Sequence, residues 1–137
     1  DFTGQAIKQA VKRGLERCFF VGMAGKLAKL AAGVMMTHWT RSKVDNELLA
    51  GITRDAGGPA ELIGEVEGAN TARHAYELWR AAGLKKAPYL LCERVAEHLR
   101  DYSEGKLEVH AIMVDFDTLE PVGASLGALD LTTWRHN

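Results

Sequence analysis

A turn rich in glycine and lysine is the part of this sequence best suited to chemistry. Gly22, Gly25 and Lys26 follow a short apolar run, and Lys29 lies one helical turn beyond Lys26. Backbone N–H groups at the start of a helix, together with nearby cations, form a site for anions. A lysine in a first helical turn is unfavourable beside the positive end of the helix dipole, and a bound anion would compensate for it. We therefore expect residues 22–29 to bind a negatively charged ligand.

The charge around this turn is one-sided. Residues 17–44 contain no Asp or Glu, and their cations are Arg17, Lys26, Lys29, Arg41 and Lys43. The whole chain is nearly neutral, with 17 basic and 18 acidic residues. Such a distribution favours a local site for an anion and argues against a nucleic-acid-binding protein that depends on overall charge.

The same turn also has a purely structural interpretation. Glycine adopts positive φ angles without strain, so Gly22 and Gly25 could be present only to make a tight turn. The spacing matches neither the GxxxxGK(S/T) phosphate loop nor the GxGxxG dinucleotide turn, and the pattern alone does not identify the anion.

A second group of polar residues follows the helix expected after this turn. His38 could act as an acid or base near neutral pH or contact a metal, and a hydrogen-bonded histidine at a helix end explains it equally well. Ser42 has the spacing of a helix N-cap with Asp45 as its reciprocal partner, which accounts for both residues without any chemistry. Thr37 could likewise serve as a cap.

Helices dominate the expected elements. Apolar spacing and capping residues predict a helix that begins near residue 25 and further helices over 4–15, 44–56, 59–67, 71–82 and 88–102. Strands are expected over 18–21, 107–115 and 120–123. The first strand is uniformly apolar, which is typical of a strand buried on both faces of a parallel sheet. It is too far from the second for a hairpin, so we expect a parallel pair joined through helices.

These elements predict a helix-rich α/β fold with a few-stranded, mainly parallel sheet flanked by helices. We expect one domain over residues 1–125 and a loose tail over 126–137. No run approaches the ~20 apolar residues of a membrane span, so no membrane partner is expected. Cys18 and Cys92 lack metal-ligand spacing and are expected to be buried free thiols, with no protein-bound metal, in a cytoplasmic protein. The remaining histidines and acidic residues are interpreted as structural or solvent-exposed.

Several short motifs also occur in an order known from one family. They are Thr3-Gly4, Val21-Gly22, the GKLAKLAAG run over residues 25–33, Thr37-His38, Ser42, Val44-Asp45, Ala69-Asn70-Thr71 and Leu107-Glu108-Val109. Together they resemble the CbiD family, which comprises cobalt-precorrin methyltransferases of the anaerobic cobalamin pathway. The resemblance covers nearly the whole chain, and its most specific part is the GKLAKLAAG run.

The resemblance implies an activity and a substrate. CbiD-like enzymes transfer a methyl group from S-adenosylmethionine to ring carbon 1 of a corrinoid, whose acetate and propionate groups make it anionic. The substrate- or anion-binding residues expected on this basis are Gly22, Gly25, Lys26, Lys29, Thr37, Arg41 and Ser42. His38 is the expected catalytic residue, as a group that handles a proton on the macrocycle.

The resemblance also implies that more polypeptide is needed. Family members are more than twice as long, and their Gly- and Thr-rich N-terminal motif is absent here. We interpret the chain as the C-terminal domain of such an enzyme, partnered by the remainder of the enzyme chain, which would hold most of the S-adenosylmethionine. The 137 residues alone are expected to be inactive. The alternative is a non-catalytic domain that binds an anion or phosphate at the glycine-lysine turn.

Overall fold

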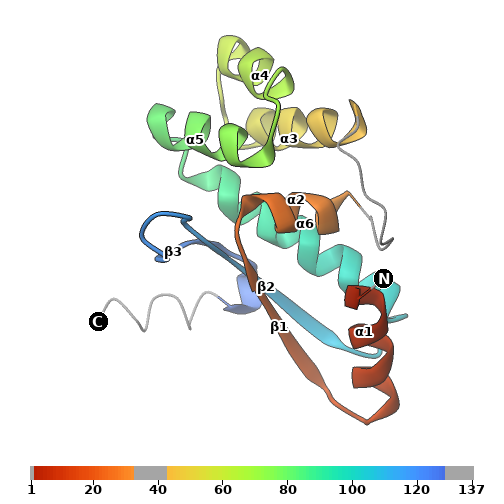
Figure 1. Cartoon of the computed structure of the whole chain (residues 1–137). Helices are drawn as coiled ribbons and strands as arrows, with labels where there is room; N and C mark the ends of the chain where they lie inside the picture. The colour runs from red at the N-terminus through yellow and green to blue at the C-terminus, as the bar shows by residue number, and fades with distance from the viewer. Residues whose placement is uncertain (1, 33–42, 129–137) are drawn as a thin grey trace.

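Helices and one small sheet make up the fold (Figure 1). The computed structural model describes residues 2–32 and 43–128. The elements in chain order are α1 (Phe2–Lys12), β1 (Arg17–Gly22), α2 (Ala24–Ala31), α3 (Lys43–Asp55), α4 (Ala60–Glu67), α5 (Ala72–Ala82), α6 (Lys86–Tyr102), β2 (Glu108–Val114), β3 (Pro121–Ala124) and the short 3-10 helix η1 (Leu126–Ala128). The expected helix-rich α/β fold is confirmed.

The sheet has the strand order β1-β2-β3. β1 and β2 are parallel, in a register that runs from Arg17 opposite Glu108 to Gly22 opposite Met113, so the expected parallel pair is confirmed. β3 returns antiparallel to β2, because a short turn can join only antiparallel neighbours. The sheet is therefore mixed, with one parallel and one antiparallel pair.

The core lies between one face of the sheet and the long helix α6. Val109, Ala111 and Met113 alternate along β2 and are fully buried, as are Leu91 and Val95 of α6. α2 packs beside α6, and α3, α4 and α5 form a group at the end of the sheet where β1 and β2 terminate (Figure 1). This arrangement places helix surface around the carboxyl ends of the two parallel strands.

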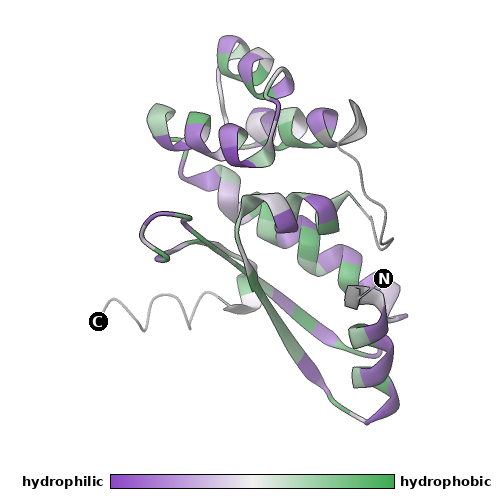
Figure 2. Cartoon of the chain, in the orientation of Figure 1, coloured by the Kyte–Doolittle hydropathy of each residue, from purple (hydrophilic) through white to green (hydrophobic). Residues whose placement is uncertain are grey.

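The expectation that β1 is buried on both faces is wrong. Phe19 and Val21 are 41% and 58% exposed, whereas Cys18 and Phe20 on the opposite face are half-buried. β1 is an edge strand, and among the described residues only its Cys18 and Phe20 face packs against the core. Figure 2 shows most of the strand in the colour of hydrophobic residues, and such a uniformly apolar sequence does not reveal which face is open.

Local signals located most helix ends correctly. Thr71 caps α5 by accepting a hydrogen bond from the backbone N–H of His74 at 3.0 Å, and Gly83 ends the same helix in the left-handed region at φ 70°. Cys92 is a buried free thiol as expected, but Cys18 is only half-buried. Within residues 2–32 and 43–128, no helix combines the length and apolar character needed to cross a membrane.

Candidate functional site

The carboxyl ends of β1 and β2 meet at one edge of the sheet (Figure 1). Gly22 ends β1 and lies opposite Met113, while β2 ends at Val114. In open α/β sheets, ligands bind outside the carboxyl ends of the strands. The glycine-lysine turn follows β1 at this edge and Asp115 follows β2, so both groups lie where a ligand is expected.

The turn after β1 presents the start of α2. Met23 precedes the helix in an extended conformation, with φ −89° and ψ 173°, and its side chain makes no capping hydrogen bond. The first backbone bond of the helix runs from the N–H of Leu27 to the carbonyl of Met23 at 3.2 Å. Within the described ranges, the N–H groups of Gly25 and Lys26 have no acceptor, and both residues are exposed. This helix start is available to an anion.

The glycines of the turn are not there to provide positive φ angles. The glycines with positive φ in the described chain are Gly14, Gly57, Gly83 and Gly105. A Cβ added at Gly22 would lie 3.7 Å from Cδ of Lys26, whereas one added at Gly25 would meet nothing within 4 Å. The stem of Lys26 therefore lies back along the end of β1, and the space beside Gly25 is open.

The other expected site residues are less fully described. Lys29 is half-buried in the last turn of α2. Thr37, His38, Arg41 and Ser42 lie outside the described residues, so their roles stay predictions.

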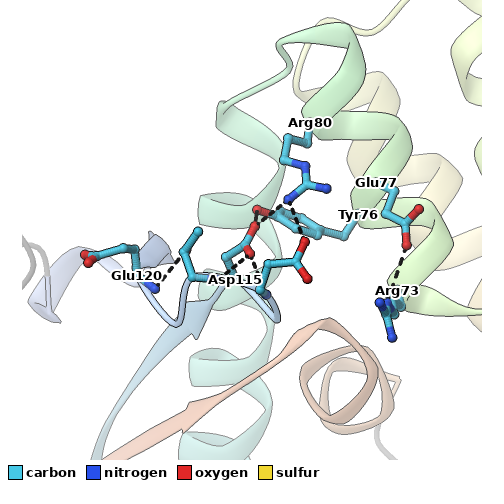
Figure 3. A network of polar contacts seen from close by, with 8 residues as sticks. Arg73, Tyr76, Glu77, Arg80, Asp115 and Glu120 are labelled. Carbon is cyan, nitrogen blue, oxygen red and sulfur yellow. Dashed lines mark hydrogen bonds and ion pairs between the residues drawn. The ribbon is translucent and has the colours of Figure 1, made fainter.

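A buried carboxylate that we did not expect as a site residue lies at the end of β2 (Figure 3). Oδ2 of Asp115 accepts hydrogen bonds from the Tyr76 hydroxyl at 2.6 Å and from Nη1 of Arg80 at 2.9 Å. Its other oxygen, Oδ1, accepts from the backbone N–H groups of Asp117 and Thr118 at 2.8 and 3.1 Å. Asp115 is 3% exposed, so its carboxylate is almost completely enclosed by the protein.

These contacts fix the protonation states of the network. The hydrogen bond from Tyr76 is the largest of the effects that lower the pKa of Asp115 to about 2, against the opposing effect of burial. Burial, followed by the bond to Asp115, raises the pKa of Tyr76 to about 12. At neutral pH the carboxylate is ionised and the phenol keeps its proton. Both carboxylate oxygens are occupied within the protein, so Asp115 positions its neighbours rather than binding a ligand.

Aromatic and cationic contacts hold the same segment against α5. The Arg73 guanidinium lies 3.7 Å from the ring centroid of Phe116, and that of Arg80 lies 5.5 Å from the same ring. The rings of Tyr76 and Phe116 meet edge to face at 6.3 Å. The chain leaving β2 is thus clamped to one face of α5, because Arg73, Tyr76 and Arg80 follow helical spacing.

Two sequence signals could have indicated this network. Asp115 directly follows an apolar strand, at the end where parallel sheets place functional side chains. Tyr76 and Arg80 are four residues apart and share a helix face. Within the described part of the chain, no group of three or more His, Cys, Asp or Glu residues is arranged to hold a metal ion.

Comparison with known proteins identifies the family. The model of the CbiD C-terminal domain matches residues 36–124, which is more than half of the chain. The chain belongs to the CbiD family. It is 76% identical over 135 residues to the cobalt-precorrin-5B C(1)-methyltransferase of Rubrobacter xylanophilus, 57% over 126 residues to that of Salinispora tropica, and 42% over 117 residues to that of Leptospira interrogans. The resemblance seen in the motifs is confirmed.

The CbiD relatives are much longer than this chain. The three alignments cover 98%, 91% and 85% of this chain but only 35%, 33% and 32% of the relatives. The chain therefore spans about a third of their length. No solved structure matches it. The match to the CbiD C-terminal domain begins at residue 36, after the glycine-lysine turn, and it includes Asp115. At the carboxyl edge of the sheet, the turn therefore comes from outside the matched region and Asp115 from inside it.

Proposed function

We propose that this chain is part of an S-adenosylmethionine-dependent methyltransferase that methylates ring carbon 1 of a cobalt-precorrin in cobalamin biosynthesis. The observation that carries the proposal is the 76% identity, over 98% of the chain, to a relative named for that reaction. Because the chain spans about a third of that relative, the remaining polypeptide has a share in the activity. We assign binding of the corrinoid substrate to this part.

The glycine-lysine turn is the proposed contact for a carboxylate of the corrinoid. The N–H groups of Gly25 and Lys26, which have no acceptor within the described ranges, and the exposed Lys26 side chain all lie at the carboxyl edge of the sheet. A carboxylate placed there would accept backbone hydrogen bonds and pair with an ammonium group. Lys29, Thr37, Arg41 and Ser42 are proposed as further contacts to the same substrate.

Orientation should contribute more to this reaction than acid–base catalysis. The ring carbon attacks the methyl carbon in line with the bond to sulfur, that bond breaks, and the sulfur keeps the electron pair. Holding the two reactants in this alignment supplies most of the rate gain available to the protein. His38 is proposed to handle a proton on the macrocycle, and most of the S-adenosylmethionine is proposed to contact the remainder of the enzyme chain.

The test is Lys26→Ala in the full-length enzyme, assayed with the cobalt-precorrin and radiolabelled methyl donor. Lys26 is exposed, so its loss should change stability by no more than about 0.5 kcal/mol. Losing a charge-assisted bond to a carboxylate should cost about 1.5–3 kcal/mol of substrate binding. That is roughly a ten- to a hundredfold rise in the substrate Kd.

Lys12→Ala is the matched control, because Lys12 is exposed near the amino end of β1, at the opposite edge of the sheet. It should leave binding and turnover at wild-type values. Equal effects of the two substitutions would rule out the turn as the substrate contact. A wild-type enzyme that binds phosphate but neither binds the corrinoid nor transfers a methyl group would instead support the non-catalytic anion-binding alternative.

A further inference from the structure

A cleft with a volume of about 430 Å³ opens between α5, the first turn of α6 and the connection from β2 to β3. Pockets for small molecules commonly measure about 300–1,000 Å³, so this cleft can hold a small ligand or one edge of a larger one. It lies beside the Asp115 network at the carboxyl edge of the sheet, and Tyr76, Arg80 and Asp115 belong to its lining (Figure 3). None of the expected site residues within the described ranges lines it.

The walls of the cleft are mainly apolar and aromatic. Trp79 donates its indole N–H to Thr53 at 2.8 Å, and Tyr76 donates its hydroxyl to Asp115, so neither keeps a hydrogen-bond donor for a ligand. Trp79 and Tyr76 are 1% and 4% exposed, so they back the cleft and present little ring surface to a ligand. Pro88 adds an apolar wall, and Tyr89, at 37% exposed, adds a further ring. A planar, apolar group is the ligand that such walls would bind.

The charge that remains available in the cleft is positive. Asp115 is its one acidic lining residue in the described chain, and both carboxylate oxygens are already occupied. Lys85 is exposed at the cleft and makes no ion pair within residues 2–32 and 43–128. Arg80 uses Nη1 for Asp115 and Asp117, and its side chain is 47% exposed.

We infer that this cleft is a second substrate subsite, which receives a carboxylate-bearing edge of a planar macrocycle, with Lys85 pairing with the carboxylate and Tyr89 packing against the ring edge. The inference rests on the proposed function, because the corrinoid is both planar and rich in carboxylates. The glycine-lysine turn and the cleft lie at the same edge of the sheet, so one large substrate can contact both.

The methyl donor also joins a planar ring to a carboxylate, but the charges in the cleft favour the corrinoid. S-adenosylmethionine carries a sulfonium and an ammonium group, each of which needs a nearby anion or acceptor. The cleft has no free carboxylate in its described lining, and its available cations would repel both groups. The corrinoid carries acidic side chains and no such cations at its edge.

The experiment compares two corrinoids in equilibrium dialysis with the full-length protein. Cobyrinic acid has free carboxylates, whereas cobinamide carries them as amides. We expect Lys85→Ala to weaken cobyrinic acid binding roughly ten- to a hundredfold and to leave cobinamide binding nearly unchanged. Tyr89→Ala should weaken both, because ring packing does not depend on the carboxylate. Lys12→Ala should change neither, and thermal unfolding would confirm that each variant is folded.

The inference is overturned if Lys85→Ala and Tyr89→Ala bind cobyrinic acid as tightly as wild type does, or if they weaken binding of S-adenosylhomocysteine alone. It is also overturned if Lys85→Ala affects both corrinoids equally, since the carboxylate would then not be involved. Failure of the proposed function is a separate observation. It would appear as an absence of methyl transfer by the wild-type enzyme, whatever the effect of Lys85→Ala on binding.

Discussion

The buried carboxylate of Asp115 makes the stability of this fold depend on pH. Its pKa falls from 3.8 to about 2 on folding, mainly because Tyr76 donates a hydrogen bond to the ionised form. Each unit of pKa shift corresponds to about 1.4 kcal/mol, so ionised Asp115 contributes about 2 kcal/mol to the free energy of unfolding at neutral pH. Because folding lowers the pKa of Asp115, this contribution is fully present at pH values above the pKa of the unfolded chain. It is lost as the pH falls through the pKa of the folded protein.

Asp115→Asn keeps the shape of the side chain and removes the titration. We expect the variant to be about 2 kcal/mol less stable than wild type at pH 7, and the difference to narrow by about 1 kcal/mol at pH 3. Urea denaturation followed by far-UV circular dichroism at several pH values would measure both curves. Glu108 also has a lowered pKa, because Arg17 donates a hydrogen bond to it, but it titrates in both proteins and cancels in the difference.

Asp117→Asn is the matched control, since Asp117 lies 3.8 Å from the same Arg80 and its side chain is 60% exposed. Exposed ion pairs contribute about 0–1 kcal/mol, so this variant should lie close to wild type in stability. The reasoning is refuted if the difference between wild type and Asp115→Asn stays constant from pH 7 to pH 3.

Further predictions concern packing and activity. A Cβ added at Gly123 would lie 2.7 Å from the backbone carbonyl of Pro88, so Gly123→Ala should destabilise the fold by about 1–3 kcal/mol in thermal or urea unfolding. Gly64→Ala is the opposite case: it lies exposed within α4 with nothing within 4 Å of the added atom, and it should raise stability by up to about 1 kcal/mol. A loss of stability at Gly64 comparable to that at Gly123 would contradict the packing argument. The 137-residue chain alone should transfer no methyl group to the cobalt-precorrin, because it spans about a third of its relatives, and measured turnover would disprove this.

The elements of this fold were largely predictable because their signals are local. Helical spacing located α1 to α6 within a few residues, and Thr71 and Gly83 marked the ends of α5. The parallel pairing of β1 with β2 followed from a general rule, namely that distant strands separated by helices pair in parallel. The helix start after β1 was also expected, because glycine-rich turns after apolar strands commonly lead into helices.

The Asp115 network and the cleft were not predictable in the same way, because their contacts are not local. Asp115 binds side chains that precede it by 39 and 35 residues, and periodicity says nothing about which distant helix face will meet a strand end. Lys85 did not stand out in the sequence, because a short polar segment after Gly83 looks the same whether or not a cleft lies beside it. The open face of β1 was missed because hydropathy cannot distinguish a covered apolar strand from an uncovered one.

The parallel pairing of the first and second strands has a consequence for the order of events during synthesis. Arg17 and Glu108, which face each other across β1 and β2, are 91 residues apart. At roughly 5–20 residues per second, a ribosome takes on the order of 5–20 s to make the partner strand after it has made β1. The Cys18–Val21 run must wait through that interval without its hydrogen-bonding partner, while α2 to α5 can already form from local contacts. The nascent chain therefore carries an unpaired apolar strand through this interval, and synonymous changes that slow translation between α2 and β2 would lengthen it.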